Sequence, residues 1–393
     1  MEHVPRVLID ITRLLYRRVT GRGYTGIDRV ALEYLRHFRD RAHAVVSWRC
    51  VAAALSDADS RRAIETLLDA RGPATSLGYR LAIQAWLWDW LRGPGANPIL
   101  LDIGHTWLDN GAYAWLLRRR GARPVFFIHD LIPILHPEFC RPGEKARHVA
   151  RMRNALRDGA GLIVNSRHTL AELERFAASG GLHMPPVVVA PLAPSVVPSA
   201  SPGPRPIEQP FFVVLGTIEP RKNHLLLLQL WGRLAERLGD SSPRLVVVGQ
   251  RGWGCEKALD LLERSEPLKG IVSERNQCGD AELANLLQHA QALLMPSFAE
   301  GYGLPVAEAL AAGLPVIASD LPAFREIAGT MPEYADPRDG PRWEALVEDY
   351  SRPDSQRRQA QLRRIRDFRP TTWAQHFEEV DRFLERLDER APA

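Results

Sequence analysis

The sequence is poor in cysteine, lacks a long hydrophobic run and carries little net charge. Its four cysteines are scattered and form no CxxC pair: Cys50, Cys140, Cys255 and Cys278. This pattern argues against a disulfide framework and against a zinc site, and it fits a reducing compartment. The most apolar window, residues 81–91, is too short to cross a bilayer and contains Asp89. No signal-peptide pattern follows Met1. We therefore expect a cytoplasmic protein, with the inner face of the cell membrane as a further location.

Arginine is concentrated in a few places, although the formal net charge is only +4. The densest places are residues 17–18, residues 118–120 and a series between residues 141 and 157. Such patches can hold anionic lipid headgroups or nucleic acid, or they can be solvated helix faces. The cations are scattered and no nucleic-acid-binding motif accompanies them, so we expect no nucleic acid partner. Peripheral contact with an anionic membrane stays open.

The chain length implies two domains, because 393 residues exceed what one hydrophobic core usually serves. Residues 191–210 contain seven prolines together with serine and glycine, which is typical of an extended, semi-rigid linker. We place the first domain at residues 1–195, the linker at residues 196–210 and the second domain at residues 211–370.

Short apolar segments with strand character recur along both domains, and helical patterns separate them. In the first domain they are residues 6–11, 45–51, 99–103, 125–128, 160–166 and 187–190; in the second they are residues 211–215, 245–248, 292–295 and 314–318. This alternation predicts two α/β domains with doubly wound, parallel sheets. Ligands of such sheets bind beyond the carboxyl ends of the strands, so the residues that follow the strands are site candidates.

The first strand of the first domain is followed by residues rich in arginine and glycine. We expect a loop over residues 12–25 that leads at Gly26 into a helix. A glycine here lets the backbone approach a diphosphate, so Gly26 is a candidate binding residue. Asp28 belongs either to that site or to a helix cap.

The strand at residues 125–128 ends in His129 and Asp130. A titratable pair at the carboxyl end of a parallel strand lies where this architecture places chemistry. His129 can donate a hydrogen bond to a sugar or to an acceptor hydroxyl. The alternative is a buried structural histidine.

In the second domain, a strand-to-helix turn begins at Gly216 and carries Arg221 and Lys222. Two adjacent cations can neutralise a diphosphate, arginine as a fork and lysine as a point charge. The alternative is a solvated helix start, but cations there oppose the helix dipole. A bound anion is therefore the better explanation.

Residues 295–318 combine a strand end, a glycine loop, a short helix and a second strand. Gly301 and Gly303 allow backbone angles and close approaches that a Cβ would block. The helix is predicted over residues 305–312, since proline suits a first helical turn and glycine suits the C′ position.

Two acids accompany this loop and helix, Glu300 on the loop and Glu308 on the helix. Free N–H groups at a helix start favour an anion. Carboxylates beside such amides fit a ligand that is both phosphorylated and rich in hydroxyls, which describes a sugar nucleotide. The alternative is that both acids are solvated surface charges.

At these residues the chain resembles glycosyltransferase family four, a family of retaining enzymes with the GT-B fold. The resemblance rests on a motif with two glutamates separated by seven residues, matched here at Glu300, Gly301, Gly303, Leu304, Pro305, Glu308, Ala309, Gly313, Pro315, Val316 and Ser319. It implies two facing Rossmann-like domains, the second of which binds the sugar nucleotide. It also implies that a terminal helix, residues 371–393, crosses back to the first domain.

The resemblance further implies roles for the candidate residues. Glu308 would hydrogen-bond ribose hydroxyls, and Glu300 would hold hydroxyls of the donor sugar. Arg221 and Lys222 would contact the diphosphate, near Gly216. The nucleotide would also be contacted by the loop residues Gly301, Tyr302, Gly303 and Leu304.

The phrase HDLIP, which begins at His129, resembles a subset of this family: mannosyl- and rhamnosyltransferases that often use GDP-sugars. In that family a histidine at this place lies beside the transferred sugar. The resemblance therefore implies a GDP-linked donor and a catalytic role for His129.

These observations predict a retaining glycosyltransferase that moves a hexose, mannose or a related sugar, in bacterial surface polysaccharide synthesis. The donor is a nucleotide-diphosphate sugar and the acceptor is a glycan or a lipid-linked glycan. We expect no metal, because the carboxylates form no DxD pair, and no cofactor apart from the donor. The alternatives are an enzyme that uses a UDP-sugar, a non-catalytic sugar-nucleotide-binding subunit, and a phosphorylase, which would need a pyridoxal phosphate lysine and a longer chain.

Overall fold

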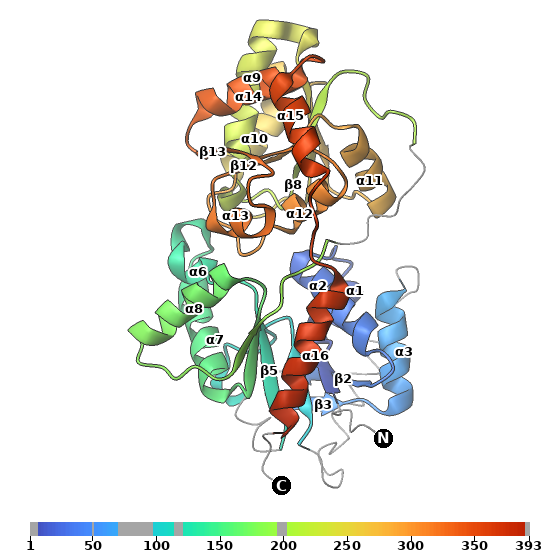
Figure 1. The fold of residues 1–393 in the computed structure, drawn as a ribbon, viewed down its shortest axis with the longest axis vertical. Coiled ribbons are helices and arrows are strands. Elements are labelled where there is room, and N and C mark those ends of the chain that lie inside the picture. The colour runs from blue at the N-terminus through green and yellow to red at the C-terminus, as the bar shows by residue number, and fades with distance from the viewer. Residues whose placement is uncertain (1–6, 49–50, 70–96, 114–120, 195–202, 390–393) are drawn as a thin grey trace. The chain divides into compact units, whose positions relative to one another are not determined.

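The computed structural model describes residues 7–48, 51–69, 97–113, 121–194 and 203–389. Their contacts divide the chain into two compact units (Figure 1). Unit 1 comprises Met1–Leu135, Pro142–Leu192 and Thr372–Ala393, and unit 2 comprises His136–Arg141 and Ala193–Thr371. The arginines predicted at residues 118–120, and much of the predicted linker, lie outside the described residues.

Unit 1 is built on one seven-stranded sheet in the order β3-β2-β1-β4-β5-β6-β7. The strands are β1 Val7–Asp10, β2 Ala42–Trp48, β3 Val51–Ala54, β4 Ile99–Asp102, β5 Arg123–Ile128, β6 Gly161–Val164 and β7 Val187–Val189. All pairings are parallel except that of β2 with β3. The doubly wound sheet is confirmed. The separate strand β3 was not predicted, because residues 45–51 were interpreted as one strand and the chain reverses after Trp48.

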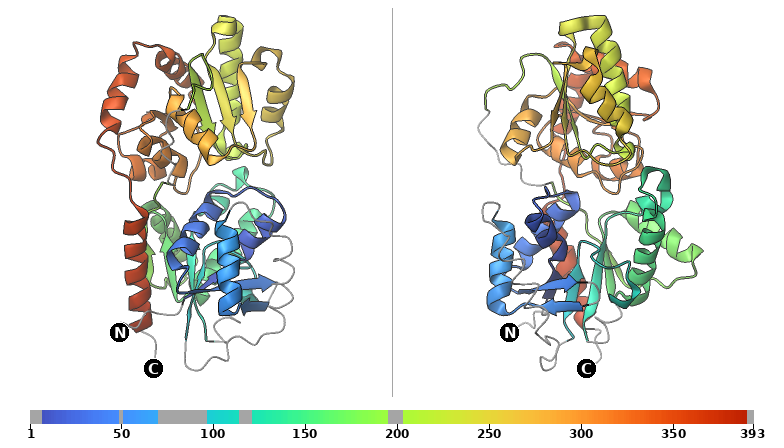
Figure 2. Two further views of the ribbon diagram at one scale, coloured as in Figure 1. Left: turned by 90° about the vertical axis from the view of Figure 1, so that its right-hand side faces the viewer. Right: turned by 180° about the vertical axis from the view of Figure 1, so that it is seen from behind.

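The helices of unit 1 cover both faces of this sheet (Figure 2). They are α1 Thr12–Val19, α2 Gly26–Phe38, α3 Asp57–Leu68, α6 Ile132–Leu135, α7 Glu144–Asp158, α8 Arg167–Ser179 and α16 Trp373–Glu389. Phe126 of β5 belongs to the same buried cluster as Met152 of α7. The next residue, Phe127, meets the ring of Tyr34 on α2 at a centroid distance of 5.9 Å. Consecutive strand residues thus pack on opposite layers, as the strand repeat of two requires.

The expectation of a loop over residues 12–25 is wrong in its first half, where helix α1 forms. Leu14 and Leu15 are buried, and their burial stabilises a helical turn. The arginines that suggested a loop are neutralised by a buried acid instead. Asp28 accepts from Arg13 Nε at 2.7 Å and lies 2.9 Å from Arg17 Nε.

The terminal helix α16 packs within unit 1. His376 Nε2 lies 3.0 Å from the hydroxyl of Tyr34, and Asp381 pairs with Arg41 at 2.6 Å. Arg123 donates to the carbonyl oxygen of Leu387 at 2.6 Å. The end of the chain is therefore held by aromatic, ionic and backbone contacts of the first unit.

Unit 2 is built on a six-stranded sheet in the order β10-β9-β8-β11-β12-β13. The strands are β8 Phe211–Leu215, β9 Arg244–Val248, β10 Val272–Arg275, β11 Leu293–Met295, β12 Val316–Ser319 and β13 Glu333–Ala335. Every pairing is parallel. The chain builds outward from β8 to one side and later returns to the other side through β11. The strand order therefore reverses between β8 and β11.

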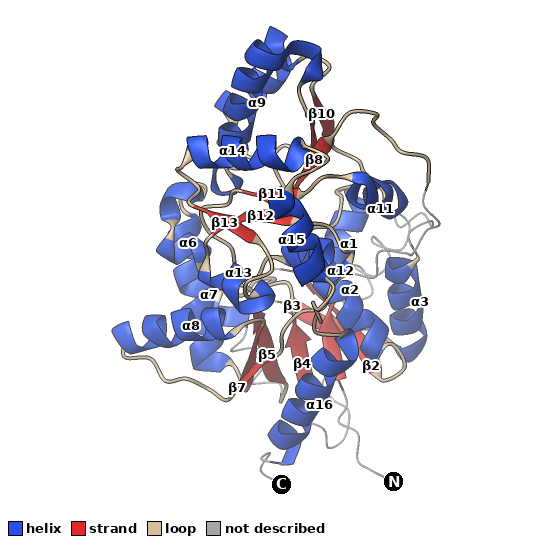
Figure 3. Ribbon diagram, turned by 45° about the horizontal axis from the view of Figure 1, so that its top comes forward, coloured by secondary structure: helices blue, strands red, loops and turns tan. Residues whose placement is uncertain are grey.

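The helices of unit 2 cover both faces of its sheet, as Figure 3 shows with strands in red. They are α9 His224–Leu238, α10 Glu256–Arg264, α11 Asp280–His289, α12 Leu304–Ala311, α13 Pro322–Ala328, α14 Gly340–Ser351 and α15 Gln356–Ile365. Phe212 shares a core with Trp231 of α9. Phe211 shares a core with Val306 of α12. None of the helices in the described part of the chain has the length and hydropathy needed to span a membrane.

The segment His136–Arg141, which includes the short 3-10 helix Pro137–Phe139, packs with unit 2 although it lies inside the first predicted domain. The reason is an aromatic contact that sequence spacing does not show. The ring of Phe139 stacks on that of Phe298, with centroids 5.1 Å apart and planes 8° from parallel.

Candidate functional site

The candidate residues of unit 2 lie on two segments that leave the sheet at its topological switch point. One segment follows β8 and runs from Gly216 to Lys222; the other follows β11 and runs from Pro296 to Gly303. The amide of Phe298 donates to the carbonyl oxygen of Arg221 at 2.8 Å, which ties the two segments together. Doubly wound sheets bind ligands at this point, beyond the carboxyl ends of the strands.

Glu300 is the centre of a buried ion cluster. Its Oε1 accepts from Lys222 Nζ at 2.5 Å and from Ser297 Oγ at 2.7 Å, and its Oε2 accepts from Arg221 Nη1 at 2.7 Å. Arg221 also donates to Glu219 at 2.6 Å. The structure thus brings together three of the predicted catalytic residues, although about eighty positions separate the cations from the acid in sequence. Ser297 and Glu219 were not predicted, although Ser297 lies in the stretch 295–318 and Glu219 lies in the turn between Gly216 and Arg221.

The protonation of this cluster follows from its burial and its charges. Burial alone would raise the pKa of Glu300, but Arg221 and Lys222 outweigh that effect and lower the pKa to about 2. Burial lowers the pKa of Lys222, and Glu300 partly restores it. The side chain of Glu300 is only 7% exposed, so the interpretation of a solvated surface acid is wrong for this residue. Arg221 and Lys222 are thus matched by the two carboxylates of Glu300 and Glu219, and both cations lie where a doubly wound sheet binds ligands.

Helix α12 begins where the glycine loop ends, and its observed bounds agree with the predicted ones to within a residue. Gly303 has a φ of 103°, and a Cβ at this position would lie 2.5 Å from Cε1 of Phe324. Both the backbone angle and the close packing therefore require glycine. Tyr302 is buried beside it, and Leu304 starts the helix.

Replacing Gly303 by alanine is expected to destabilise the protein by about 2 to 4 kcal/mol, since it combines a left-handed backbone with a steric clash. Urea denaturation measures this change. Gly313→Ala is the matched control, because Gly313 has a φ of 75° but open space around its Cβ position. The steric contribution is the difference between the two variants. Equal destabilisation by both would contradict the close packing of the loop on α13.

Glu308 and Gly216 complete the predicted set in unit 2. Glu308 lies on α12 and is 5% exposed, so it is not a solvated surface acid either. Gly216 has a φ of 143°, and its Cβ position is 3.2 Å from Cε of Lys222. The glycine thus lets the lysine side chain lie against the backbone of the turn. The contact of Gly301, Tyr302 and Glu308 with a nucleotide stays a prediction.

His129 lies in unit 1, after β5, and is buried. Its Nε2 is 2.8 Å from the carbonyl oxygen of Ile103, and a carbonyl oxygen only accepts. Burial lowers the pKa of His129 to about 4, so the ring is neutral at pH 7, with its proton on Nε2. Nδ1 is then an acceptor. The expectation that His129 donates a hydrogen bond must be corrected, since in this tautomer the remaining ring nitrogen only accepts; the contact of His129 with a sugar stays a prediction.

A second histidine lies beside His129 and a third lies beside the second, and both were missed in the sequence. The ring centroid of His105 is 5.5 Å from that of His129 and 6.0 Å from that of His148. Burial lowers the pKa of both His105 and His148. His105 follows the carboxyl end of β4, so the rule that selected His129 would have found it as well.

Asp28 and Gly26 stand at the start of α2. Asp28 is fully buried and completes a capping box with Thr25, whose amide donates to Asp28 Oδ2 at 2.7 Å. The cap interpretation of Asp28 is therefore confirmed. Gly26 is the first helical residue, and its approach to a diphosphate stays a prediction.

Buried acids terminate the two central strands of unit 1. Asp10 accepts from Ser47 Oγ at 2.7 Å and from the hydroxyl of Tyr113 at 2.8 Å. Asp102 is fully buried, and its Oδ2 has no hydrogen-bond partner among the described residues. Burial, reinforced by Asp10, raises the pKa of Asp102 well above its ordinary value.

Part of the chain is similar in sequence to known proteins. Residues 201–331 match the family described as glycosyl transferases group 1. Among curated proteins, the chain is 29% identical over 240 residues to the serotype-specific mannosyltransferase WbdA of Escherichia coli, covering 54% of this chain and 28% of WbdA. It is 28% identical over 270 residues to the O-antigen chain mannosyltransferase B of Escherichia coli, covering 65% and 68% of the two chains. The chain thus spans little more than a quarter of the length of WbdA.

Solved structures share the fold over nearly the whole chain. Sucrose-phosphate synthase from Thermosynechococcus elongatus superposes with a TM-score of 0.65 at 16% identity and covers 98% of this chain and 99% of its own. Anabaena HepE in complex with UDP and glucose gives a TM-score of 0.68 at 14% identity, covering 97% and 100%.

The fold and the matched segment define a GT-B protein with a group 1 glycosyl transferase domain in unit 2. The matched segment contains Arg221, Lys222, Glu300 and Glu308. The predicted GT-B fold is confirmed, and the predicted similarity to glycosyltransferases is confirmed over residues 201–331.

Proposed function

We propose that this protein transfers a hexose, with mannose as the first candidate, from a nucleotide-diphosphate sugar to a glycan or lipid-linked glycan acceptor. The observation that carries the proposal is the Arg221, Lys222 and Glu300 cluster at the switch point of unit 2. It places two cations where the fold binds ligands, within the segment that matches the glycosyl transferases. The mannosyltransferases WbdA and O-antigen chain mannosyltransferase B support mannose and a role in bacterial surface polysaccharide synthesis.

In this proposal the cations act on charge that grows as the donor breaks. Cleavage of the sugar–phosphate bond leaves a nucleoside diphosphate, and Arg221 and Lys222 stabilise its additional negative charge. Glu308 hydrogen-bonds the ribose hydroxyls, and Glu300 holds hydroxyls of the sugar. The sugar passes through an oxocarbenium-like state, and the acceptor oxygen bonds to it on the same face from which the leaving group departs. The leaving phosphate oxygen takes the acceptor proton, so the configuration is retained and no cofactor or metal takes part.

We assign the acceptor to unit 1, where His129 accepts a hydrogen bond at Nδ1. A neutral histidine that only accepts suits a hydroxyl group and not a phosphate oxygen, which has no proton to offer at neutral pH. Lipid-linked acceptors reside in membranes, so this assignment also brings the protein to an anionic membrane surface.

A donor screen tests the proposal. GDP-mannose, GDP-rhamnose and UDP-glucose are each incubated with an acceptor glycan, and nucleoside diphosphate release is measured. GDP-mannose is expected to turn over fastest, and proton NMR of the product is expected to show the configuration of the donor. Calorimetry with GDP and GMP is the control: GDP should bind at least about tenfold more tightly, since charge-assisted hydrogen bonds to a second phosphate contribute about 1.5 to 3 kcal/mol.

The outcomes separate the proposal from its alternatives. Fastest turnover with a UDP-sugar would replace the GDP assignment. Tight GDP binding without turnover of any donor would favour a non-catalytic subunit. Absence of binding by every nucleoside diphosphate would refute the donor site itself.

A further inference from the structure

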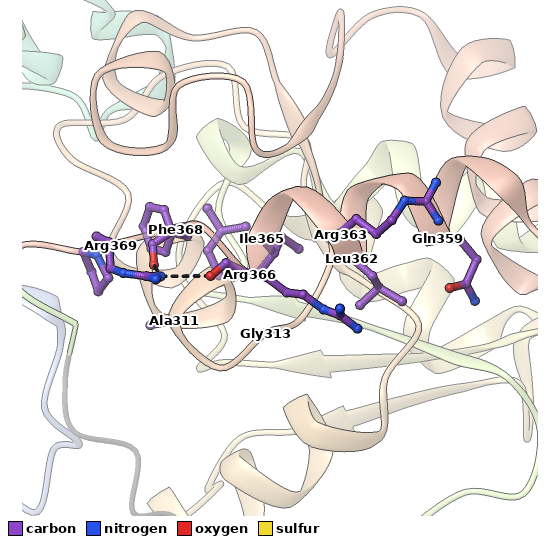
Figure 4. Close-up of a pocket in the computed structure, with 11 residues that line it drawn as sticks. Ala311, Gly313, Gln359, Leu362, Arg363, Ile365, Arg366, Phe368 and Arg369 are labelled. Carbon is purple, nitrogen blue, oxygen red and sulfur yellow. Dashed lines mark hydrogen bonds between the residues drawn. The ribbon is translucent and has the colours of Figure 1, made fainter.

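A pocket lies in unit 2, at the opposite end of α12 from the glycine loop (Figure 4). Its volume is about 480 Å³, and it lies between the end of α12 and helix α15 with the residues that follow it. The floor is apolar: Leu310 and Ile365 are buried, and Leu362 and Phe368 are half-buried. Three arginines stand among the lining residues, namely Arg363, Arg366 and Arg369. No acidic side chain is among the described residues that line it.

This pocket is separate from the proposed donor site. Glu300 and the glycine loop precede the first residue of α12, whereas Ala311 and Gly313 of the pocket stand at its end. Eight helical residues with a rise of 1.5 Å each put about 12 Å between the two ends. Figures 1 and 3 both show α12 and α15 side by side. A ligand of this pocket therefore does not compete with a nucleotide at the other end of the helix.

The segment from residue 356 to residue 370 carries six arginines and one acid, Asp367. Four of the arginines have structural partners within unit 2: Arg357 is near Glu333, Arg358 donates to Gln291, Arg364 donates to Met331, and Arg369 donates to the carbonyls of Arg366 and Phe368. Arg369 thereby satisfies backbone acceptors just past the end of α15, which explains its presence without a ligand.

Arg363 and Arg366 are different, since the guanidinium group of neither has a hydrogen-bond or ion-pair partner among the residues that the structure describes. Both are exposed, and both line the apolar pocket (Figure 4). Two uncompensated guanidinium groups favour a phosphate or carboxylate group, which arginine binds as a fork.

The lining indicates what is attached to that anion. A sugar or a nucleotide needs hydrogen-bonding groups for its hydroxyls and base, but Gln359 supplies the only uncharged polar side chain of the described lining. Leucine, isoleucine, phenylalanine and proline supply the remaining large contacts. An anionic group beside an apolar surface matches the headgroup and first chain carbons of an acidic phospholipid.

We propose that the pocket between α12 and α15, with Arg363 and Arg366, docks unit 2 on acidic phospholipid headgroups of a membrane. Headgroup phosphates pair with the guanidinium groups of Arg363 and Arg366, and the glycerol and first acyl carbons lie against Leu362 and Phe368. This inference rests on the proposed use of a lipid-linked acceptor, because that proposal is the reason for assigning the anion to a lipid. It does not depend on the transfer reaction.

Vesicle sedimentation tests the proposal with the full chain. Vesicles of 30% phosphatidylglycerol in phosphatidylcholine are expected to bind the protein, and vesicles of phosphatidylcholine alone are not. The double variant Arg363→Glu/Arg366→Glu is expected to lose at least about tenfold in vesicle affinity, because each arginine near such a surface contributes about fivefold. Binding is expected to weaken with added salt. Arg363→Gln/Arg366→Gln repeats the test without charge reversal, in case the first variant fails to fold.

Two control variants carry the same change of charge. Lys257→Glu/Arg264→Glu alters exposed residues of α10 in the same unit and is expected to bind as the unchanged protein does. Lys145→Glu/Arg153→Glu alters exposed residues of the arginine series on α7. Undiminished binding by both α15 variants, or loss of binding by the α7 variant alone, would overturn the proposal. Full competition by 10 mM inorganic phosphate would also overturn it, since the pocket would then be a simple anion site.

Activity on a water-soluble acceptor separates this inference from the proposed function. The α15 variants are expected to keep their turnover in solution and to lose only the vesicle-dependent part. If no donor is turned over at all but vesicle binding still depends on Arg363 and Arg366, the docking site stands and the transfer assignment fails.

Discussion

Replacing Lys222 by alanine is expected to lower kcat at least about 100-fold, with a smaller effect on the KM of the donor. The ammonium group lies 2.5 Å from Glu300 in a buried setting, where a positive charge is worth more to a developing anion than it is in water. The ground-state diphosphate keeps Arg221 as a partner, so donor binding falls less than the rate does. Steady-state kinetics with GDP-mannose measures both constants.

Lys269→Ala is the control for this variant, because Lys269 is exposed and pairs with Glu266 three residues earlier. It is expected to have unchanged kinetics. The fold of Lys222→Ala should persist, since Arg221 still pairs with Glu300 at 2.7 Å. Near-normal kcat in a folded Lys222→Ala protein would show that the cluster does not act on the leaving group, and it would remove the main support for the proposed mechanism.

The sequence predicted the parts of unit 2 that depend on local backbone chemistry. Proline and glycine fixed the ends of α12, and the positive φ of Gly303 is the conformation that a glycine before such a helix indicates. The buried strands β8, β9 and β12 are continuous apolar runs, which are typical of parallel sheets covered on both faces. In each case the signal lies within a few residues of the structure it produces.

The sequence was less informative where a contact joins distant residues. Helix α1 was interpreted as a loop because the segment is rich in arginine and glycine. The sequence does not show that Asp28 on α2 neutralises two of these arginines. The proton of His129 is placed by the carbonyl of Ile103, 26 positions away. In the sequence, Arg363 and Arg366 cannot be distinguished from the other arginines of α15. In the structure, the guanidinium groups of Arg364 and Arg369 donate to backbone carbonyls, and those of Arg363 and Arg366 do not. Hydrogen-bond accounting of this kind needs coordinates.

Glu300 presents a conflict that the sequence did not reveal. In the proposed mechanism it holds sugar hydroxyls, yet both of its oxygens bind cations that the diphosphate also needs. Without a ligand, Glu300 therefore occupies the place of an anion. Donor binding must redistribute these contacts, so that the cations turn at least partly to phosphate and Glu300 turns to the sugar. Removing its charge should therefore lower the stability of the free protein and increase the stabilisation that a bound diphosphate provides.

Glu300→Gln is expected to destabilise the free protein by about 3 kcal/mol, because it leaves the buried Lys222 without a compensating charge and leaves Arg221 with Glu219 alone. GDP is expected to raise the Tm of this variant more than it raises that of the unchanged protein, since the diphosphate then supplies the missing negative charge. Transfer is expected to be lost all the same, because the sugar loses its carboxylate. Thermal unfolding with and without GDP measures the first two effects. Glu266→Gln, at an exposed ion pair, is the control.

The pH dependence of stability gives an independent check on the same residue. The pKa of Glu300 is lowered from 4.5 to about 2 in the folded protein, so its carboxylate stabilises the fold fully above pH 4.5. That contribution decreases as the pH falls from about 4.5 to about 2, where the folded protein also takes up the proton. The unchanged protein is therefore expected to lose stability over this interval more steeply than Glu300→Gln. Parallel pH profiles, or a smaller GDP effect on the Tm of the variant, would show that Glu300 does not neutralise the two cations, and the exchange of partners on donor binding would have to be abandoned.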